Sequence, residues 1–169
     1  YLDADYLAIN ISSPNTEKLR ELSNRENLEF LMKKISQKKS QLIEMHKQTI
    51  PIFVKLSPDE SDDNLKNIIY ISEKNNIDGF ICCNTTTEHS YPNSGGMSGA
   101  MLSKKAENLL KKIAKIKQEK SILIASGGVM SANDVKLRLS NSADLVQLYT
   151  GYIYHGNSLL KKALKISSS

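Results

Sequence analysis

The sequence has little cysteine, no tryptophan and no long apolar run, and each shortage narrows the possible classes of protein. Only two of 169 residues are cysteine, and they are neighbours, Cys82 and Cys83. Adjacent side chains of a strand point to opposite faces, so a mutual disulfide is not expected. The spacing C-x-x-C is missing, so the cysteines give no support to a metal site and we expect none. No apolar run approaches the roughly 18 residues that a spanning helix needs.

The net charge limits the kinds of partner that the protein could bind. The formal net charge is +5 and the pI is about 9.1, a balance that favours anionic partners. The lysines, however, come in pairs spread along helix-like segments, which is typical of solvated helix faces and does not predict nucleic-acid binding. These pairs are Lys33–Lys34, Lys38–Lys39, Lys104–Lys105 and Lys111–Lys112. The 169 residues are enough for one domain, and the hydrophobic fraction of 40% is typical of a globular chain.

Short apolar, β-prone segments alternate with segments of helical periodicity. Strands are expected at 6–11, 51–56, 79–84, 121–125 and 145–149. Helices are expected at 25–35, 65–71, 103–117, from 131 onward and at 159–166. Ser131 and Asp134 have the spacing of a helix-capping box. The strands are apolar on both faces, as a covered parallel sheet requires.

Five βα units fit two architectures, an open doubly wound sheet or part of an eight-stranded barrel. In both, the functional site lies at the carboxyl ends of the strands. The polar and glycine residues of this chain collect there. They are the segment 10–15, Lys55, the segment 84–86, Gly127–Gly128 and Tyr149–Thr150.

Each of these groups has a functional interpretation and a plainer alternative. Gly127–Gly128 allows backbone N–H groups to approach an anion, and the loops after the last two barrel strands often bind phosphate, but the pair could be an ordinary turn. Lys55 could be a fixed cation facing developing negative charge, or a surface lysine at a strand tip. Asn10, Asn15 and Asn84 suit a planar ligand with donors and acceptors, although asparagine is also common in turns.

Two serines, Ser12 and Ser13, lie among these asparagines. The three histidines fall in a helix tail, a loop and the region past the last strand, so a Ser-His-Asp triad is a poor fit. A serine without a histidine could still remove a proton if the site lowered the cost of losing its own.

An ordered series of segments resembles the dihydroorotate dehydrogenase family. Asn-Ile-Ser-Ser-Pro-Asn-Thr at 10–16 resembles the active-site segment of that family, and the other matching segments are 54–59, 84–86, 95–99, 126–128 and 145–150. The resemblance implies an α/β fold, a TIM (βα)8 barrel that binds flavin mononucleotide (FMN). It aligns this chain with strands 4 to 8, so residues 1–169 would be the C-terminal portion of a single barrel domain, without strands 1–3 and a membrane-docking region.

The resemblance also implies roles for individual residues. The catalytic residues would be Ser13, as the base that removes the C5 proton of dihydroorotate, and Thr16, which would help carry the proton out. The substrate contacts would be Asn10, Asn15, Asn84 and Thr85. The cofactor contacts would be Asn10, Lys55, Cys83, Ser98, Gly99, Gly127, Gly128, Tyr149 and Thr150.

The class within the family follows from one residue. The related soluble enzymes use cysteine at the Ser13 position, so serine implies the quinone-reducing, membrane-associated class. The C6 hydride of dihydroorotate would pass to FMN, orotate would leave, and a quinone would reoxidise the flavin. Eukaryotic members of this class imply a place at the mitochondrial inner membrane.

Some residues depart from the family pattern. Cys83 stands where relatives often have a threonine that touches the flavin, and the segment 141–144 replaces a turn that usually contains glycine. The loop from 88 to 94 is short. A related flavin barrel acting on another pyrimidine, and a non-catalytic phosphate-binding barrel fragment, are the alternatives. Because five strands cannot close an eight-stranded barrel, we expect residues 1–169 alone to be unstable or to aggregate.

Overall fold

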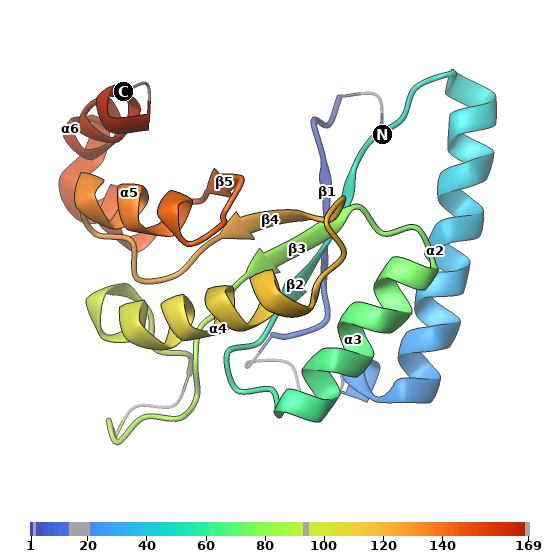
Figure 1. The fold of residues 1–169 in the computed structure, drawn as a ribbon, viewed down its shortest axis with the longest axis horizontal. Coiled ribbons are helices and arrows are strands. Elements are labelled where there is room, and N and C mark those ends of the chain that lie inside the picture. Colours follow the sequence, from blue (N-terminus) through green and yellow to red (C-terminus); the bar gives the residue numbers. More distant parts are fainter. Residues whose placement is uncertain (2, 14–20, 93–94, 168–169) are drawn as a thin grey trace.

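A computed structural model describes residues 1, 3–13, 21–92 and 95–167, and its elements alternate between strands and helices (Figure 1). The strands are β1 (Leu7–Asn10), β2 (Ile52–Leu56), β3 (Gly79–Cys82), β4 (Ile122–Ala125) and β5 (Leu145–Val146). The helices are α2 (Arg25–His46), α3 (Asp62–Lys74), α4 (Ser103–Ile116), α5 (Ala132–Ser140) and α6 (Thr150–Ser167), with 3-10 turns η1 (Glu21–Ser23) and η2 (Gly99–Leu102). None of the helices in these ranges combines the length and apolarity needed to cross a bilayer.

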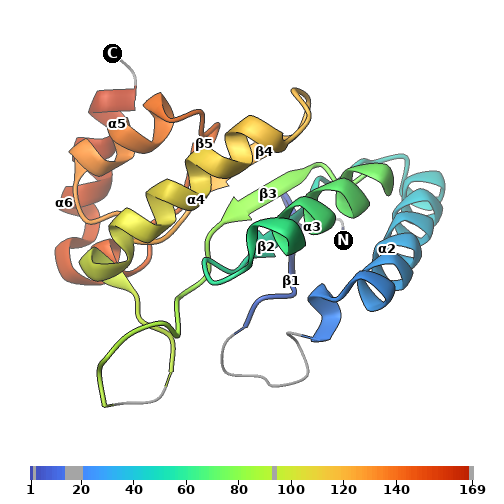
Figure 2. The same ribbon diagram turned by 60° about the horizontal axis from the view of Figure 1, so that its bottom comes forward.

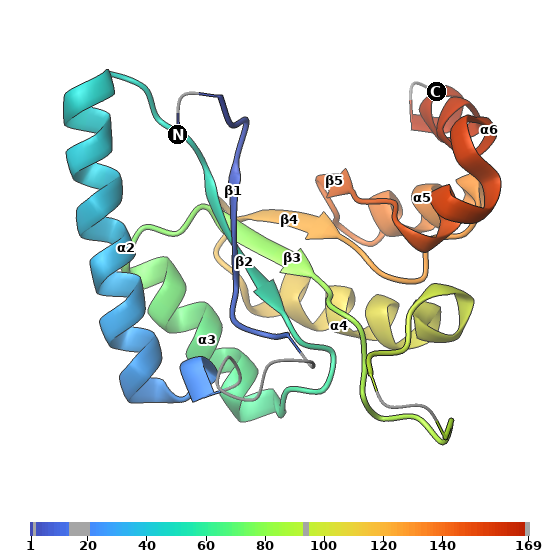
Figure 3. The same cartoon turned by 180° about the vertical axis from the view of Figure 1, so that it is seen from behind.

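The sheet decides between the two expected architectures. All strand pairs are parallel, and the strand order is the chain order, β1-β2-β3-β4-β5. Helices α3 and α4 lie in front of the sheet in Figures 1 and 2, and the view from behind in Figure 3 brings the strands forward of them. A doubly wound sheet reverses its strand order at a switch point and carries helices on both faces. The sequential order with helices on one face is that of a βα barrel, as predicted.

The two faces of the sheet pack against different partners. Val54, Leu56 and Phe80 belong to the large core that the strands share with the helices. On the opposite face Phe53, Ile81 and Ile124 form a smaller buried cluster. This alternation follows from the two-residue period of a strand.

The face without helices is concave. The Tyr6 ring packs edge-on against Phe53, with ring centroids 5.4 Å apart. The Gln147 side chain, just past β5, donates a hydrogen bond to the Tyr6 hydroxyl at 2.9 Å. The two ends of the sheet therefore meet across this face, which is the inner face of a barrel wall.

Several boundaries differ from the expected ones, and α2 continues to His46 rather than ending at residue 35. β5 ends at Val146 rather than at residue 149, and α6 begins at Thr150 rather than at residue 159. α6 is kinked at Gly156, whose backbone angles (φ 54°, ψ −147°) are not helical. The glycines of this segment weaken its helical pattern, which explains why sequence periodicity placed the start of the helix too late.

Two lysines were wrongly assigned to solvated helix faces. Lys39 is buried, with 9% of its surface exposed, and pairs with Asp78. Lys105 is partly buried and contacts Asp59 and Glu88. Both lie where a helix meets a neighbouring loop, so their ammonium groups reach carboxylates that are distant in sequence and that helical periodicity does not reveal.

Candidate functional site

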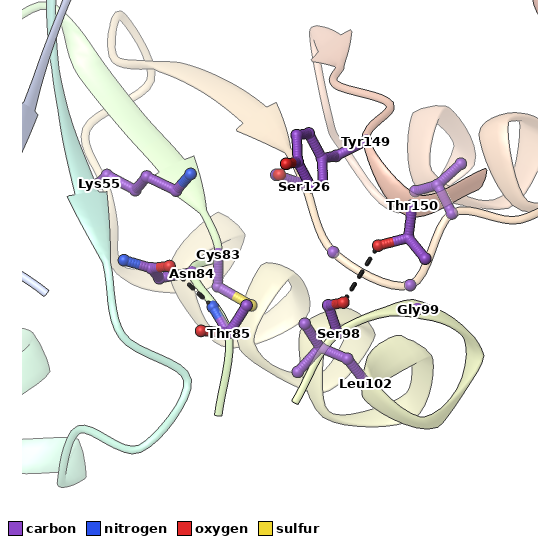
Figure 4. A pocket seen from close by; sticks show the side chains of 13 residues that line it. Lys55, Cys83, Asn84, Thr85, Ser98, Gly99, Leu102, Ser126, Tyr149 and Thr150 are labelled. Carbon is purple, nitrogen blue, oxygen red and sulfur yellow. Dashed lines mark hydrogen bonds between the residues drawn. The ribbon is translucent and has the colours of Figure 1, made fainter. Parts of the chain in front are cut away.

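A cavity lies at the carboxyl ends of the strands, where the sequence predicted a site (Figure 4). It is lined by Lys55, Cys83, Asn84, Thr85, Ser98, Gly99, Leu102, Ser126, Gly127, Gly128, Val129, Tyr149 and Thr150. Ten of these thirteen are predicted substrate or cofactor contacts. The fold therefore brings together residues from the ends of β2, β3 and β4 and from the start of α6, which are far apart in the chain.

The glycine loop after β4 forms one wall of the cavity. Gly127 and Gly128 have positive φ angles of 90° and 69°, which favour glycine. A Cβ atom on Gly128 would lie 2.2 Å from the Cα of Ser103, at the start of α4. Glycine is therefore required here to let the loop pack against α4, and the same packing leaves backbone at the cavity wall.

Beside the glycine loop, a hydrogen bond joins two segments that are far apart in the sequence. The Thr150 hydroxyl donates a hydrogen bond to the Ser98 hydroxyl at 3.1 Å, as Figure 4 shows. A Cβ atom on Gly99 (φ 71°) would lie 3.2 Å from the Cγ2 of Thr150. Small residues at 98, 99, 127 and 128 with a threonine between them leave room for a compact polar group such as a phosphate.

Side chains of the chain itself accept hydrogen bonds from the backbone N–H groups at the N-terminus of α5. The Asp134 carboxylate accepts hydrogen bonds from the backbone N–H groups of Met130 and Ser131, at 3.0 and 2.8 Å. The Ser131 hydroxyl accepts from the Asp134 backbone N–H at 3.2 Å, which completes the expected capping box. Asp134 thus already supplies negative charge at this helix end, so an anion in the cavity depends on the glycine loop instead.

Asn10, Ser12 and Asn84 form a hydrogen-bonded cluster beside the cavity. The Asn84 amide donates to the Asn10 amide oxygen at 3.3 Å and to the Ser12 hydroxyl at 3.2 Å. The Ser12 hydroxyl donates to the Asn10 amide oxygen at 3.2 Å. Asn10 pairs in register with Lys55, whose side chain lines the cavity. The predicted amide contacts therefore hold each other in place.

Other predicted residues have different placements. Asn10 reaches the cavity only through Asn84 and its pairing with Lys55, since it is not among the lining residues. Ser13 follows the buried Ser12 and is itself partly exposed. Asn15 and Thr16 lie outside the described residues.

Both cysteines are free thiols, and both are buried in the core that the strands share with the helices, so the expected placement on opposite faces is not seen. Cys82 is the last residue of β3, and Cys83, directly after it, also lines the cavity. Burial raises the pKa of Cys83 to about 12. The thiol is therefore protonated at neutral pH and can donate a hydrogen bond into the cavity.

An ion cluster that was not expected from the sequence supports the loop that carries Asn84 and Thr85. The Asp59 carboxylate accepts hydrogen bonds from the Thr86 hydroxyl, from the Thr87 backbone N–H at 2.8 Å and from Lys105. Burial alone would raise the pKa of Asp59, but the hydrogen bonds from Lys105 and the threonines outweigh it and lower the pKa. Asp59 thus ties the loop after β3 to both α4 and the loop after β2.

Three lining residues were not predicted as site residues: Leu102, Ser126 and Val129. Ser126 and Val129 flank the glycine pair, so their position next to it was an available signal. Leu102 lies in the 3-10 turn before α4, and nothing in its local pattern distinguishes it from a core leucine.

Sequential parallel strands with helices on one face, and a glycine-lined cavity at the strand ends, define the class of βα-barrel proteins. A model of the dihydroorotate dehydrogenase family matches residues 3–166, and the chain belongs to this family.

Individual relatives agree with this assignment. The chain is 42% identical to the dihydroorotate dehydrogenase (quinone) of Dichelobacter nodosus and 38% identical to that of Halorhodospira halophila, over 99% and 98% of its length. It covers 52% and 50% of those proteins. A crystal structure of the Eimeria tenella enzyme in complex with ferulenol matches with a TM-score of 0.88 and 28% identity, over 97% of this chain and 49% of that one.

The comparisons also limit the conclusions. The chain spans about half the length of the curated relatives it matches, and its five strands form the corresponding part of a TIM barrel. The relatives from Dichelobacter nodosus and Halorhodospira halophila are bacterial, so they give no support to the mitochondrial location that the resemblance implied.

Proposed function

We propose that the protein to which this chain belongs oxidises dihydroorotate to orotate, with FMN as hydride acceptor and a quinone as final electron acceptor. The observation that carries the proposal is the coincidence of the cavity with the residues implied by the family. Eight of the nine predicted cofactor contacts line it, and Asn84 and Thr85 line it beside them. Family membership supports the reaction class, and the names of the relatives support the quinone.

The residues present fit FMN. A phosphate would lie between the loops that carry Ser98–Gly99 and Gly127–Gly128, where glycine leaves the backbone accessible. Lys55 would lie toward the flavin ring and stabilise negative charge on it. Cys83 would donate a hydrogen bond from its protonated thiol. The flavin, when bound, supplies the hydride-accepting group that no side chain provides.

The substrate would lie beside the Asn10–Ser12–Asn84 cluster. Amide groups match the donors and acceptors of a dihydropyrimidine ring, and the mutual hydrogen bonds preorganise them. Ser13, next to this cluster in the chain, would take the C5 proton. Because quinones dissolve in lipid, the proposal places the reoxidation step at a membrane, through contacts outside these 169 residues.

The test is the visible spectrum of the purified intact protein before and after anaerobic addition of dihydroorotate. We expect a flavin band that dihydroorotate bleaches and that a quinone restores. Dihydrouracil serves as the control substrate and should leave the band unchanged. Bleaching by dihydrouracil instead would move the substrate to another pyrimidine. Folded protein without a flavin band would favour the non-catalytic phosphate-binding alternative.

A further inference from the structure

Arg138 is a buried guanidinium directly behind the glycine loop. It belongs to α5, and only 1% of its surface is exposed. Its Nη2 donates hydrogen bonds to the Ser103 carbonyl oxygen at 2.8 Å, to the Ser103 hydroxyl at 3.1 Å and to the Gly127 carbonyl oxygen at 3.4 Å. Ser103 is also the residue against which Gly128 packs. The guanidinium therefore touches both segments that make this wall of the cavity, from the side away from the cavity.

The charge of Arg138 is only partly compensated within the described part of the chain. Its Nε and Nη1 atoms are buried and have no hydrogen-bond partner there. The Glu107 carboxylate lies 3.8 Å from Nη1, beyond hydrogen-bond range, and its other oxygen pairs with Lys111. Burial lowers the pKa of Arg138, an effect that the carboxylates of Glu107 and Asp134 oppose. An arginine remains charged in proteins, so positive charge persists behind the loop.

A buried charge without full compensation is costly, and a fold that needed only a tether could use a neutral side chain. An anion on the cavity side of the glycine loop would supply the missing negative charge. The positive charge acts across one layer of backbone, where water screens it little.

We propose that Arg138 is a positioning residue that stabilises the phosphate group of the bound flavin. It acts through the Gly127–Gly128 loop and does not touch the phosphate itself. The inference rests on the proposed function, because it takes the cavity to hold FMN. The proposal gives a role to a residue outside the cavity lining. It also gives a reason for a buried cation between α4 and α5.

The experiment compares FMN with riboflavin, which has the same ring and ribityl chain but no phosphate. Apoprotein of the intact protein is titrated with each ligand, and binding is followed by quenching of flavin fluorescence. We expect Arg138→Met to weaken FMN binding about tenfold and to change riboflavin binding less than about twofold, because only the phosphate feels the lost charge. Arg138→Lys should retain most of the preference for FMN. The control is Lys136→Met, which removes an exposed positive charge from the same helix and should leave both affinities unchanged.

A second variant should change the preference for FMN over riboflavin in the opposite direction. Glu107→Gln removes the negative charge nearest to Arg138 and should raise the ratio of FMN to riboflavin affinity by about two- to threefold. It keeps the test decisive if Arg138→Met fails to fold. Equal weakening of both ligands in folded Arg138→Met would make Arg138 a structural tether and overturn the inference, and so would an unchanged or lowered ratio in Glu107→Gln. A parent protein that binds both flavins without preference overturns the inference while leaving the flavin site intact, whereas binding of neither flavin would sink the proposed function.

Discussion

Ser12 and Ser13 are neighbours in the chain, and their surroundings differ. Ser12 is buried, and its hydroxyl is engaged with the side chains of Asn10 and Asn84. Those contacts make it part of the support of the site, because its proton and one of its lone pairs are already used. Ser13 is partly exposed at the end of the same segment. The proposed division of roles is therefore that Ser12 holds the amides and Ser13 accepts the proton.

The first prediction concerns the proton acceptor. Ser13→Ala in the intact protein should leave flavin content unchanged and slow flavin reduction by dihydroorotate by about 100-fold or more, since only the general base is lost. The measurement is anaerobic stopped-flow absorbance of the flavin band. Ser13→Cys is the matched variant and should retain part of the rate, because a thiol can also take up the proton in its thiolate form. Loss of bound flavin in Ser13→Ala would instead give Ser13 a structural role.

Some site residues were predictable from sequence because their type is unusual at a strand end. Lys55 after an apolar run and the glycine pair after β4 are examples. Leu102 and Arg138 were not, since a leucine or an arginine in a helical segment looks ordinary in the sequence. Their importance comes from packing across segments, which periodicity does not encode.

At the scale of elements, the turn between α5 and β5 contains a residue with an unfavourable backbone conformation. Ser142 has a positive φ of 71°, in a segment where the family resemblance implied a glycine-containing turn. A non-glycine residue is disfavoured there because its Cβ crowds the backbone. The sequence identified this segment as a departure from the family pattern, and the structure gives its physical consequence.

The second prediction follows from that backbone angle. Ser142→Gly should raise the free energy of unfolding by about 0.5–1 kcal/mol, because the relief of strain exceeds the added entropy of the unfolded chain. Urea unfolding of the intact protein measures it. The control is Ser140→Gly, two residues earlier at the end of α5, which should lower stability because glycine disfavours helix. A destabilised Ser142→Gly would mean that the serine side chain makes a compensating contact.

The third prediction concerns the Asp59–Lys105 cluster between loops. Asp59→Asn should lower the free energy of unfolding by about 1.5–3 kcal/mol at pH 7, the range for hydrogen bonds to a charged group. The pKa of Asp59 is lowered from 3.8, so its contribution is complete above about pH 4 and is lost as the pH falls through the lowered pKa. The difference in the free energy of unfolding between the parent and Asp59→Asn should therefore shrink below pH 3.8.

The matched control is Asp62→Asn. Asp62 also pairs with a lysine, Lys112, but both side chains are more than half exposed. Surface pairs contribute little, so this variant should destabilise the protein much less than Asp59→Asn does. Similar losses in both variants, or a gap for Asp59→Asn that stays constant with pH, would contradict the assigned role. Because Asp59 holds the loop of Asn84 and Thr85, the variant should also raise the KM for dihydroorotate.

At the scale of the whole molecule, the five parallel βα units were predictable because each unit repeats the same pattern, whereas the sequential strand order followed only from the family resemblance. Apolar segments of similar length and polar strand ends place five parallel strands beside one another. The boundaries of β5 and α6 were not predictable, since they lie where glycines interrupt the helical pattern and where the sheet has a free edge. β5 has only two residues, and the side chain of Leu145 is 53% exposed.

That edge leads to the last prediction. Each outer strand leaves one row of backbone groups unpaired within the described sheet, and an apolar groove lies beside β5, lined by Val135, Leu139, Leu145, Leu160 and Leu164 among others. Unpaired edges next to exposed apolar side chains promote association. Residues 1–169 produced alone should therefore form oligomers or aggregates, as measured by size-exclusion chromatography with light scattering. Co-expression with the first half of a family member, such as the Dichelobacter nodosus enzyme, should reduce this association, because three further strands would cover both edges. A monomer that unfolds cooperatively by itself would show instead that the concave face and its Tyr6–Gln147 contact are enough to stabilise a half-barrel.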